Sequence, residues 1–131
     1  MEIARMIEGL LDSVILIDHF NNKKKATLFL SALDPNKMAI SVITRAELLV
    51  GFEREGVRTK AQNLMDQFNL LIIDKETADK AAELRREYKW KLPDAFQAAI
   101  ALNHGLKFYT RNTKDFNPKK HTFVIIPYRL P

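Results

Sequence analysis

Short apolar runs alternate along the chain with longer segments in which apolar residues recur every three or four positions. The first pattern indicates strands and the second indicates helices that pack on one face. The predicted strands cover residues 7–11, 38–40, 70–73, 106–109 and 122–126. The predicted helices cover residues 14–20, 23–33, about 41–56, 57–68, 74–88 and 93–103, with Gly56 ending the third of them. Because Leu70 to Ile73 contains no polar residue, helices are expected to cover both faces of that strand.

Strands separated by helices predict a mostly parallel sheet between two helical layers, a three-layer α/β/α sandwich. With 131 residues the chain has the length of one domain, and no linker or repeat divides it. Ligands of such folds bind beyond the carboxyl ends of the strands, where the strand order reverses. Asp12 follows the first predicted strand and Asp115 lies in the loop after the fourth, so we look for chemistry there.

The composition argues against several kinds of functional site and against a membrane or secreted location. The absence of cysteine excludes disulfides, thiolate zinc sites and cysteine nucleophiles, and the three histidines are too scattered for a helical zinc pair. The apolar runs are far shorter than the roughly 20 residues that span a bilayer. Glu2, Arg5, Glu8 and Asp12 interrupt any secretory signal at the N-terminus. We therefore expect a cytoplasmic protein with no membrane contact.

Four acidic residues are candidates for catalysis, although each also has a structural explanation. Asp12 suits the cap of the next helix, and Glu47 completes a Thr-x-x-Glu capping box that begins at Thr44. Asp94 lies in the first turn of a helix, where the macrodipole favours a carboxylate. Asp115 suits a turn. Taken singly, these positions do not establish a catalytic site.

Taken together, the segments around these acids resemble a known family. The sequences are LLDSVILID at 10–18, ISVITRAELLVG at 40–51, LPDAFQAAI at 92–100 and TRNTKDF at 110–116. Their order and spacing resemble the PIN-domain family over essentially the whole chain, and above all the VapC-type ribonuclease toxins of toxin–antitoxin pairs. The resemblance implies a PIN-like fold and a metal-dependent endoribonuclease of a type II toxin–antitoxin system.

The resemblance also implies a role for individual residues. The catalytic and metal-binding acids are Asp12, Glu47, Asp94 and Asp115, with support from Ser13, Thr110 and Asn112. Two positions depart from the family pattern: Val14 stands where Asn or Ser is frequent, and Asn112 where many members carry an acid. The second departure leaves open whether Asn112 or Asp115 lies nearer the metal.

Physical chemistry indicates which cation such a cluster would bind. Carboxylates about 5 Å apart repel by roughly 3 kcal/mol per pair at an effective dielectric of 20, so a cluster stays ionised only with a cation. Oxygen ligands without His or Cys favour Mg²⁺, with Mn²⁺ possible, over zinc. A bound Mg²⁺ activates water, so RNA hydrolysis needs no protein nucleophile. The family precedent implies 3′-hydroxyl and 5′-phosphate products.

The charge of the chain agrees with a polyanionic substrate. Its net charge is +5 and its estimated pI is 9.5, and gathering four acids in a cleft makes the remaining surface more basic still. Arg111 and Lys114 share a loop with Asp115, so both are expected to contact RNA phosphates. The resemblance further implies a homodimer and a cognate antitoxin protein. Four aromatic residues are interpreted as core or interface residues, namely Phe20, Phe29, Phe52 and Trp90.

Two other interpretations belong to different functional classes. A phospho-acceptor receiver domain is also a parallel α/β fold with a Mg²⁺ pocket, and Asp74 after the third strand and Thr110 after the fourth would suit it. However, a receiver needs an acid pair at the first strand and a lysine after the last, and here Asp12 stands alone and Pro127 follows Ile126. A catalytically silent RNA-binding PIN relative would lack one of the acids, and none is missing.

Overall fold

A computed structural model describes residues 7–131, so Glu2 and Arg5, which enter the argument about a secretory signal, lie outside the described residues. The strands are β1 (Gly9–Leu11), β2 (Met38–Ser41), β3 (Asn69–Leu71), β4 (Lys107–Tyr109) and β5 (Val124–Ile125). The helices are α2 (Ser13–Phe20), α3 (Lys24–Ser31), the 3-10 turn η1 (Pro35–Lys37), α4 (Val42–Gly51), α5 (Glu55–Met65), α6 (Lys75–Tyr88) and α7 (Leu92–Asn103).

Within residues 7–131 the strands form one five-stranded sheet in the order β3-β2-β1-β4-β5. Every pair of neighbouring strands is parallel, and in the central strand Leu10 lies between Ala39 of β2 and Phe108 of β4. Successive strands lead from β1 towards β3 on one side, and the chain then crosses back to β4 on the other side. The strand order therefore reverses between β1 and β4, as expected for a ligand site.

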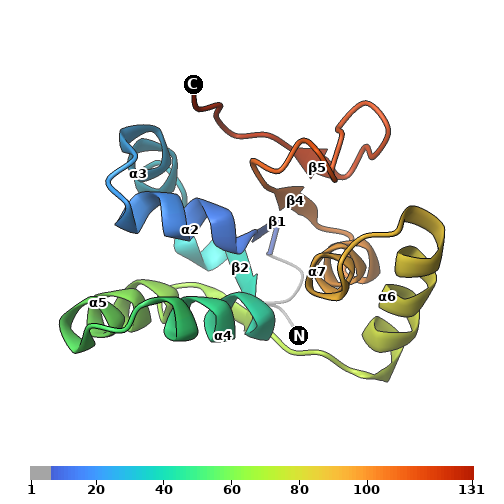
Figure 1. Cartoon of the computed structure of the whole chain (residues 1–131), viewed down its shortest axis with the longest axis horizontal. Coiled ribbons are helices and arrows are strands. Elements are labelled where there is room, and N and C mark those ends of the chain that lie inside the picture. The colour runs from blue at the N-terminus through green and yellow to red at the C-terminus, as the bar shows by residue number, and fades with distance from the viewer. Residues whose placement is uncertain (1–6) are drawn as a thin grey trace.

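Helices cover both faces of the sheet, which confirms the predicted sandwich (Figure 1). Neighbouring residues of a strand point to opposite faces. Leu10 accordingly belongs to the core beneath α6 and α7, and Leu11 belongs to the core beneath α2 to α5. Both leucines are fully buried. The chain thus folds around two apolar cores separated by a single sheet.

Two sequence-based expectations are wrong in detail. The strand expected at Leu70 to Ile73 is β3 at the edge of the sheet, and Leu70 and Ile72 are 47% and 68% exposed. Helices therefore do not cover both of its faces. Gly56 does not end α4, because that helix ends at Gly51 and Gly56 lies inside the first turn of α5.

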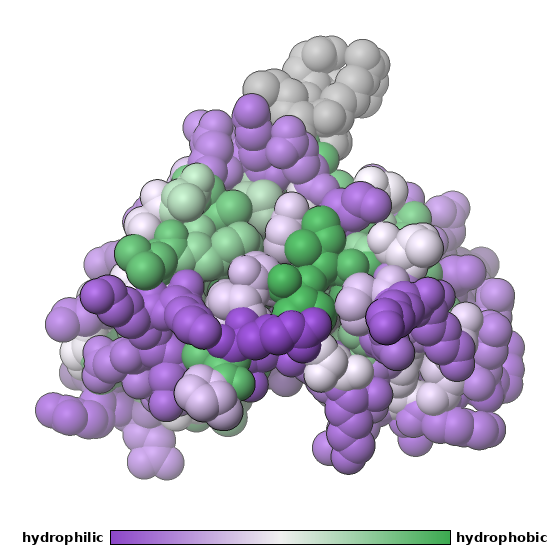
Figure 2. All heavy atoms as spheres, turned by 90° about the horizontal axis from the view of Figure 1, so that it is seen from above, coloured by the Kyte–Doolittle hydropathy of each residue, from purple (hydrophilic) through white to green (hydrophobic). Residues whose placement is uncertain are grey.

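The surface is mainly hydrophilic, with separate hydrophobic patches between the charged side chains, as Figure 2 shows for one face. No helix in residues 7–131 has the length and apolar character needed to cross a membrane.

Candidate functional site

The carboxyl ends of three neighbouring strands carry the centre of the site. Because β2, β1 and β4 are parallel and adjacent, their ends meet at one edge of the sheet. Ser41 is the last residue of β2, Asp12 follows β1, and Thr110 follows β4. The amide of Asp12 still donates to the carbonyl of Tyr109 at 2.9 Å, so the pairing of β1 with β4 extends to the acid itself.

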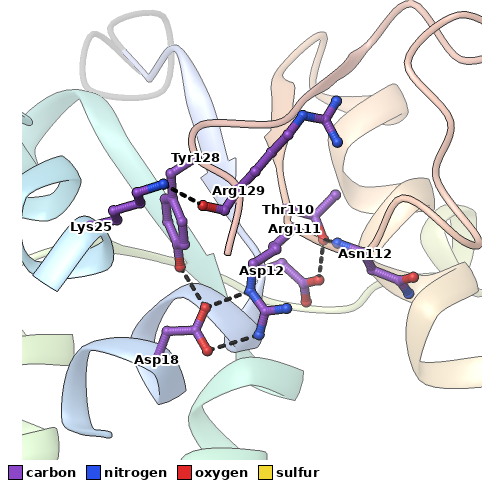
Figure 3. A network of polar contacts seen from close by, with 8 residues as sticks. All are labelled: Asp12, Asp18, Lys25, Thr110, Arg111, Asn112, Tyr128 and Arg129. Carbon is purple, nitrogen blue, oxygen red and sulfur yellow. Dashed lines mark hydrogen bonds and ion pairs between the residues drawn. The ribbon is translucent and has the colours of Figure 1, made fainter. Parts of the chain in front are cut away.

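Asp12 is 7% exposed and is held by hydrogen bonds on both carboxylate oxygens. The Ser13 amide donates to Oδ1 at 2.8 Å. The Thr110 hydroxyl donates to Oδ2 at 2.7 Å (Figure 3). Asp12 is also the N-cap of α2, so the capping explanation for this residue is correct and coexists with its place in the site. Burial raises the pKa of Asp12, the bonds from Thr110 and Ser13 oppose the rise, and the charge of Glu47 adds to it.

Gln97 links Asp12 to the next strand, and sequence reasoning missed this role. Its side chain is 1% exposed on α7. The Gln97 amide nitrogen donates to the Thr44 hydroxyl at 2.8 Å and approaches Asp12 Oδ1 at 3.5 Å. Its carbonyl oxygen accepts from the Ser41 hydroxyl at 2.6 Å. The available signal was a lone polar residue among alanines one turn after Asp94, on the same side of the helix.

Asp94 and Glu47 complete a set of carboxylates that influence one another. Burial, followed by the charges of Asp12 and Asp115, raises the pKa of Asp94 to about 6, with Lys91 opposing the rise. Glu47 lies on α4, where desolvation raises its pKa, the Ser13 hydroxyl opposes the rise, and the charge of Asp94 adds to it. The capping box predicted for Glu47 is wrong, because Ser41 caps α4 by accepting from the Thr44 amide at 3.2 Å. Capping of α4 therefore does not account for Glu47.

Asn112 and Asp115 form one closed turn in the loop after β4. The Asn112 amide donates to Asp115 Oδ2 at 2.9 Å, and the Asp115 backbone amide donates to Asn112 Oδ1 at 3.2 Å. The Asn112 backbone amide also donates to the Thr110 hydroxyl at 3.0 Å. Asn112 lines the same hollow as Asp12 and Asp94, whereas Asp115 faces a neighbouring hollow. Asn112 therefore lines the hollow of the acids directly, whereas Asp115 acts on it through its charge, which contributes to the raised pKa of Asp94.

The hollow that holds Asp12 and Asp94 has a volume of about 430 Å³ and opens to solvent. Ser13 and Val14 form one wall, and Arg111, Asn112 and Lys114 come from the loop after β4. It thus combines carboxylates with basic side chains, as a site for a phosphodiester and a cation requires.

Arg111 has a different principal contact from the phosphate contact expected of it. Its Nε and Nη2 donate to the carboxylate of Asp18 at 2.7 and 2.9 Å, and the Tyr128 hydroxyl donates to the same carboxylate at 2.7 Å (Figure 3). Burial on its own raises the pKa of Asp18, but the hydrogen bonds from Arg111 and Tyr128 outweigh it and the pKa is lowered. Arg111 thus joins the loop to α2 and to the C-terminal segment.

The oxygen donors of the site fit a hard divalent cation, although they are not gathered into a closed cage. Within residues 7–131 no group of three or more His, Asp or Glu side chains could hold a metal ion as it stands. Mg²⁺ nevertheless keeps several waters and is usually bound through one or two carboxylates. Because Asp12 and Asp94 share one hollow and the charge of Asp12 contributes to the raised pKa of Asp94, a cation between them would relieve their repulsion.

The raised pKa of Asp94 predicts how pH and Mg²⁺ change stability. The folded protein binds a proton here more tightly than the unfolded chain does, so stability from this group falls as pH rises from the ordinary Asp value of 3.8 to about 6. Without divalent cations we expect a lower melting temperature at about pH 7.5 than at about pH 5 from this contribution. Mg²⁺ should raise the melting temperature more at the higher pH, where no proton competes.

Calorimetry of the wild type and of Asp94→Asn in EDTA and in Mg²⁺ checks this expectation. In the variant, the rise in melting temperature caused by Mg²⁺ should be nearly the same at both pH values. An equal effect of Mg²⁺ on the wild type at both pH values would contradict it.

The receiver alternative is not supported by the position of Asp74. That residue follows the edge strand β3, and β2 separates β3 from the strand that leads to Asp12. The Asp74 carboxylate caps α6, because it accepts from the amide and the hydroxyl of Thr77 at 2.8 and 2.7 Å. Asp74 therefore has a structural role away from the hollow.

Comparison with known proteins agrees with this architecture. The PIN domain family matches residues 9–119. A chain in a toxin-antitoxin complex from Klebsiella pneumoniae is 38% identical, with a TM-score of 0.85 over 94% of this chain and 100% of that chain. FitAcB from Neisseria gonorrhoeae is 24% identical, with a TM-score of 0.75 over 90% of this chain and 96% of that chain. No curated protein matches the chain.

A more distant solved structure has the same fold. DNA-bound VapBC from Salmonella typhimurium is 22% identical, with a TM-score of 0.70 over 84% of this chain and 90% of that chain. The family match confirms the resemblance to PIN domains on which the sequence interpretation relied, and the 38% identical chain comes from a toxin-antitoxin complex.

Proposed function

Because the chain belongs to the PIN domain family, we propose that it is a Mg²⁺-dependent endoribonuclease and the toxin of a type II toxin–antitoxin pair. The observation that carries the proposal is the hollow at the end of β1, where Asp12 and Asp94 meet and the carboxyl of Asp94 has a pKa of about 6. Burying interacting acids is costly in a structural role but useful for binding a cation.

Each residue of the site has a part in this reaction. Asp12 and Asp94 would hold the cation, and Glu47 and Asp115 would bind it directly or through water. Thr110, Ser13 and Asn112 support these groups. When bound, Mg²⁺ lowers the pKa of a water and offsets charge that develops on the phosphodiester.

One of the acids can also accept the proton that the attacking water loses. The raised pKa of Glu47 makes its carboxylate a better proton acceptor than an ordinary glutamate. The attacking water would lose one proton to the carboxylate as its oxygen adds to phosphorus, and the bond from phosphorus to the 3′ oxygen would break. The 3′ oxygen would take a proton from solvent, so the products carry a 3′-hydroxyl and a 5′-phosphate. Mn²⁺ has similar ligand preferences and is expected to replace Mg²⁺.

The direct test is cleavage of a mixed RNA pool by the purified protein. We expect cleavage in Mg²⁺, loss of cleavage in EDTA, and recovery when excess Mg²⁺ is restored, measured by gel electrophoresis with analysis of the product ends. Cleavage that continues in EDTA would contradict the metal-dependent mechanism. RNA binding without cleavage in either Mg²⁺ or Mn²⁺ would instead indicate a catalytically silent PIN relative.

The same proposal includes partners for the toxin. We propose a homodimer and inhibition by a cognate antitoxin protein, because a 38% identical chain belongs to a toxin-antitoxin complex. A cytoplasmic location follows from the same role, since RNA and the antitoxin would both be met there.

A further inference from the structure

A second hollow of about 300 Å³ adjoins the proposed catalytic one. Lys114 lines both hollows, and Asp115 lines the second. The remaining walls come from the C-terminal end of α6, the loop between α6 and α7, and the loop before β5, namely Tyr88, Trp90, Asn117, Lys120 and His121. A chain that leaves the first hollow past Lys114 therefore enters the second.

The basic side chains of this hollow are available for a ligand. Within residues 7–131 neither Lys114 nor Lys120 forms a salt bridge, and both residues are exposed. The ammonium of Lys120 lies 5.2 Å from the centroid of the Tyr88 ring, a weak cation–π contact that a phosphate can replace.

An ordered aromatic cluster forms the rest of the hollow. The rings of Tyr88 and Trp90 stack with centroids 4.6 Å apart, and His121 meets the Tyr88 ring edge-on at 4.8 Å. Trp90 is 4% exposed, as expected of a core residue, and its indole nitrogen donates to the carbonyl of Asp115 at 3.0 Å. The cluster therefore holds the backbone of Asp115 and supplies aromatic side chains to the lining of the hollow.

We propose that this second hollow binds a nucleotide of the same RNA strand, next to the one whose phosphodiester lies at the acids. Lys114 and Lys120 would bind its phosphate, and Tyr88 and His121 would contact its base or ribose. This subsite rests on the proposed function, because it takes the substrate of that reaction to be RNA. It adds a place where the strand is held beyond the point of cleavage.

Two features favour RNA over an acidic polypeptide as the occupant. Single-stranded RNA is typically bound by cations that follow the backbone together with aromatic side chains that contact the bases. Here the two kinds of side chain share one hollow. The hollow also continues into the proposed cleavage site through Lys114, which matches the covalent continuity of a polynucleotide.

The single tryptophan provides a direct probe, because Trp90 is the only tryptophan in the chain and lines this hollow. The experiment titrates the protein in EDTA with a single-stranded RNA tetranucleotide and records Trp90 fluorescence. Anisotropy of a labelled copy of the same RNA measures binding independently. We expect a saturable fluorescence change, and a Lys120→Gln variant should bind the RNA about five- to tenfold more weakly.

Lys119→Gln is the matched control, because Lys119 is adjacent, exposed and outside the lining of the hollow. It should bind RNA within about twofold of the wild type. Equal weakening in the two variants, or binding seen by anisotropy without a fluorescence change, would overturn the subsite. So would an equal fluorescence change with a poly-glutamate peptide, which would assign the hollow to an acidic protein.

The outcome is separable from that of the proposed function. Lys120-dependent binding by a protein that does not cleave RNA in Mg²⁺ would keep the subsite and reject the nuclease. Cleavage by a protein whose RNA affinity does not depend on Lys120 would keep the nuclease and reject the subsite.

Discussion

Replacing Asp12 by asparagine should abolish RNA cleavage while leaving the protein at least as stable as the wild type. The substitution removes a charge that would hold the cation. Metal catalysis contributes several kcal/mol to lowering the barrier, so a fall of about 1,000-fold in the cleavage rate is expected. The stability follows from the pKa of Asp12, which burial raises, because an ionised group of that kind destabilises the folded state at neutral pH.

The measurements are single-turnover cleavage rates and thermal unfolding of the same preparations. The asparagine side chain of the Asp12→Asn variant keeps one carbonyl oxygen for the amide of Ser13, so the cap of α2 survives. Asp79→Asn is the control, because Asp79 is an acid on α6 that does not line the hollow, and it should leave the cleavage rate unchanged. A fully active Asp12→Asn would reject the proposed role of this residue.

Replacing Arg111 by glutamine should destabilise the fold, which distinguishes its observed contact from the phosphate contact suggested by the sequence. The Asp18 side chain is only 5% exposed, and loss of Arg111 leaves that carboxylate with Tyr128. Breaking a buried ion pair costs about 3–5 kcal/mol. Because the Arg111 side chain is 32% exposed, we expect a smaller loss of about 2–3 kcal/mol in the free energy of unfolding.

Urea unfolding at several pH values measures this loss, with Lys114→Gln as the matched control. Lys114 is an exposed basic residue of the same loop, and its replacement should change stability by less than about 0.5 kcal/mol. Because the folded pKa of Asp18 is lowered, the ion pair stabilises the protein above the ordinary Asp value of 3.8 and less as pH falls below it. The difference in the free energy of unfolding between the wild type and Arg111→Gln should therefore shrink in acid. An unchanged stability of Arg111→Gln at neutral pH would contradict the structural role of Arg111.

The layered fold could be predicted from the sequence because the signals for its strands and helices lie within short segments of the chain. Apolar runs of strand length alternate with helical periodicity, and Asp34, Ser41 and Asp74 supply side-chain caps at the starts of helical segments. The exposure of Leu70 could not be predicted in this way. A run of apolar residues looks the same in an edge strand and in a central strand, and the difference depends on the strand order of the whole sheet.

The candidate site was predictable as far as its acids were recognisable by position and resemblance. Its supporting contacts were not, because they join residues far apart in the chain. Asp18 meets Arg111 and Tyr128 across about a hundred residues, and nothing in the local sequence around Asp18 distinguishes it from a solvated helix residue. Gln97 differs from Asp18 in that the sequence carried a signal for it. A buried amide in an alanine-rich helix requires polar partners.

The attachment of residues 128 and 129 to the first helices has a consequence for how this protein can be inactivated. Tyr128 reaches Asp18, and the carbonyl of Arg129 accepts from Lys25 of α3 at 2.8 Å (Figure 3). Because Asp18 also binds Arg111, a substitution that breaks the contacts of Tyr128 or Arg129 should loosen the loop that carries Asn112 and Asp115. The proposed toxin role therefore predicts that, in a genetic selection for cells that survive expression of this protein, escape mutations accumulate at Tyr128 and Arg129 as well as at the four carboxylates.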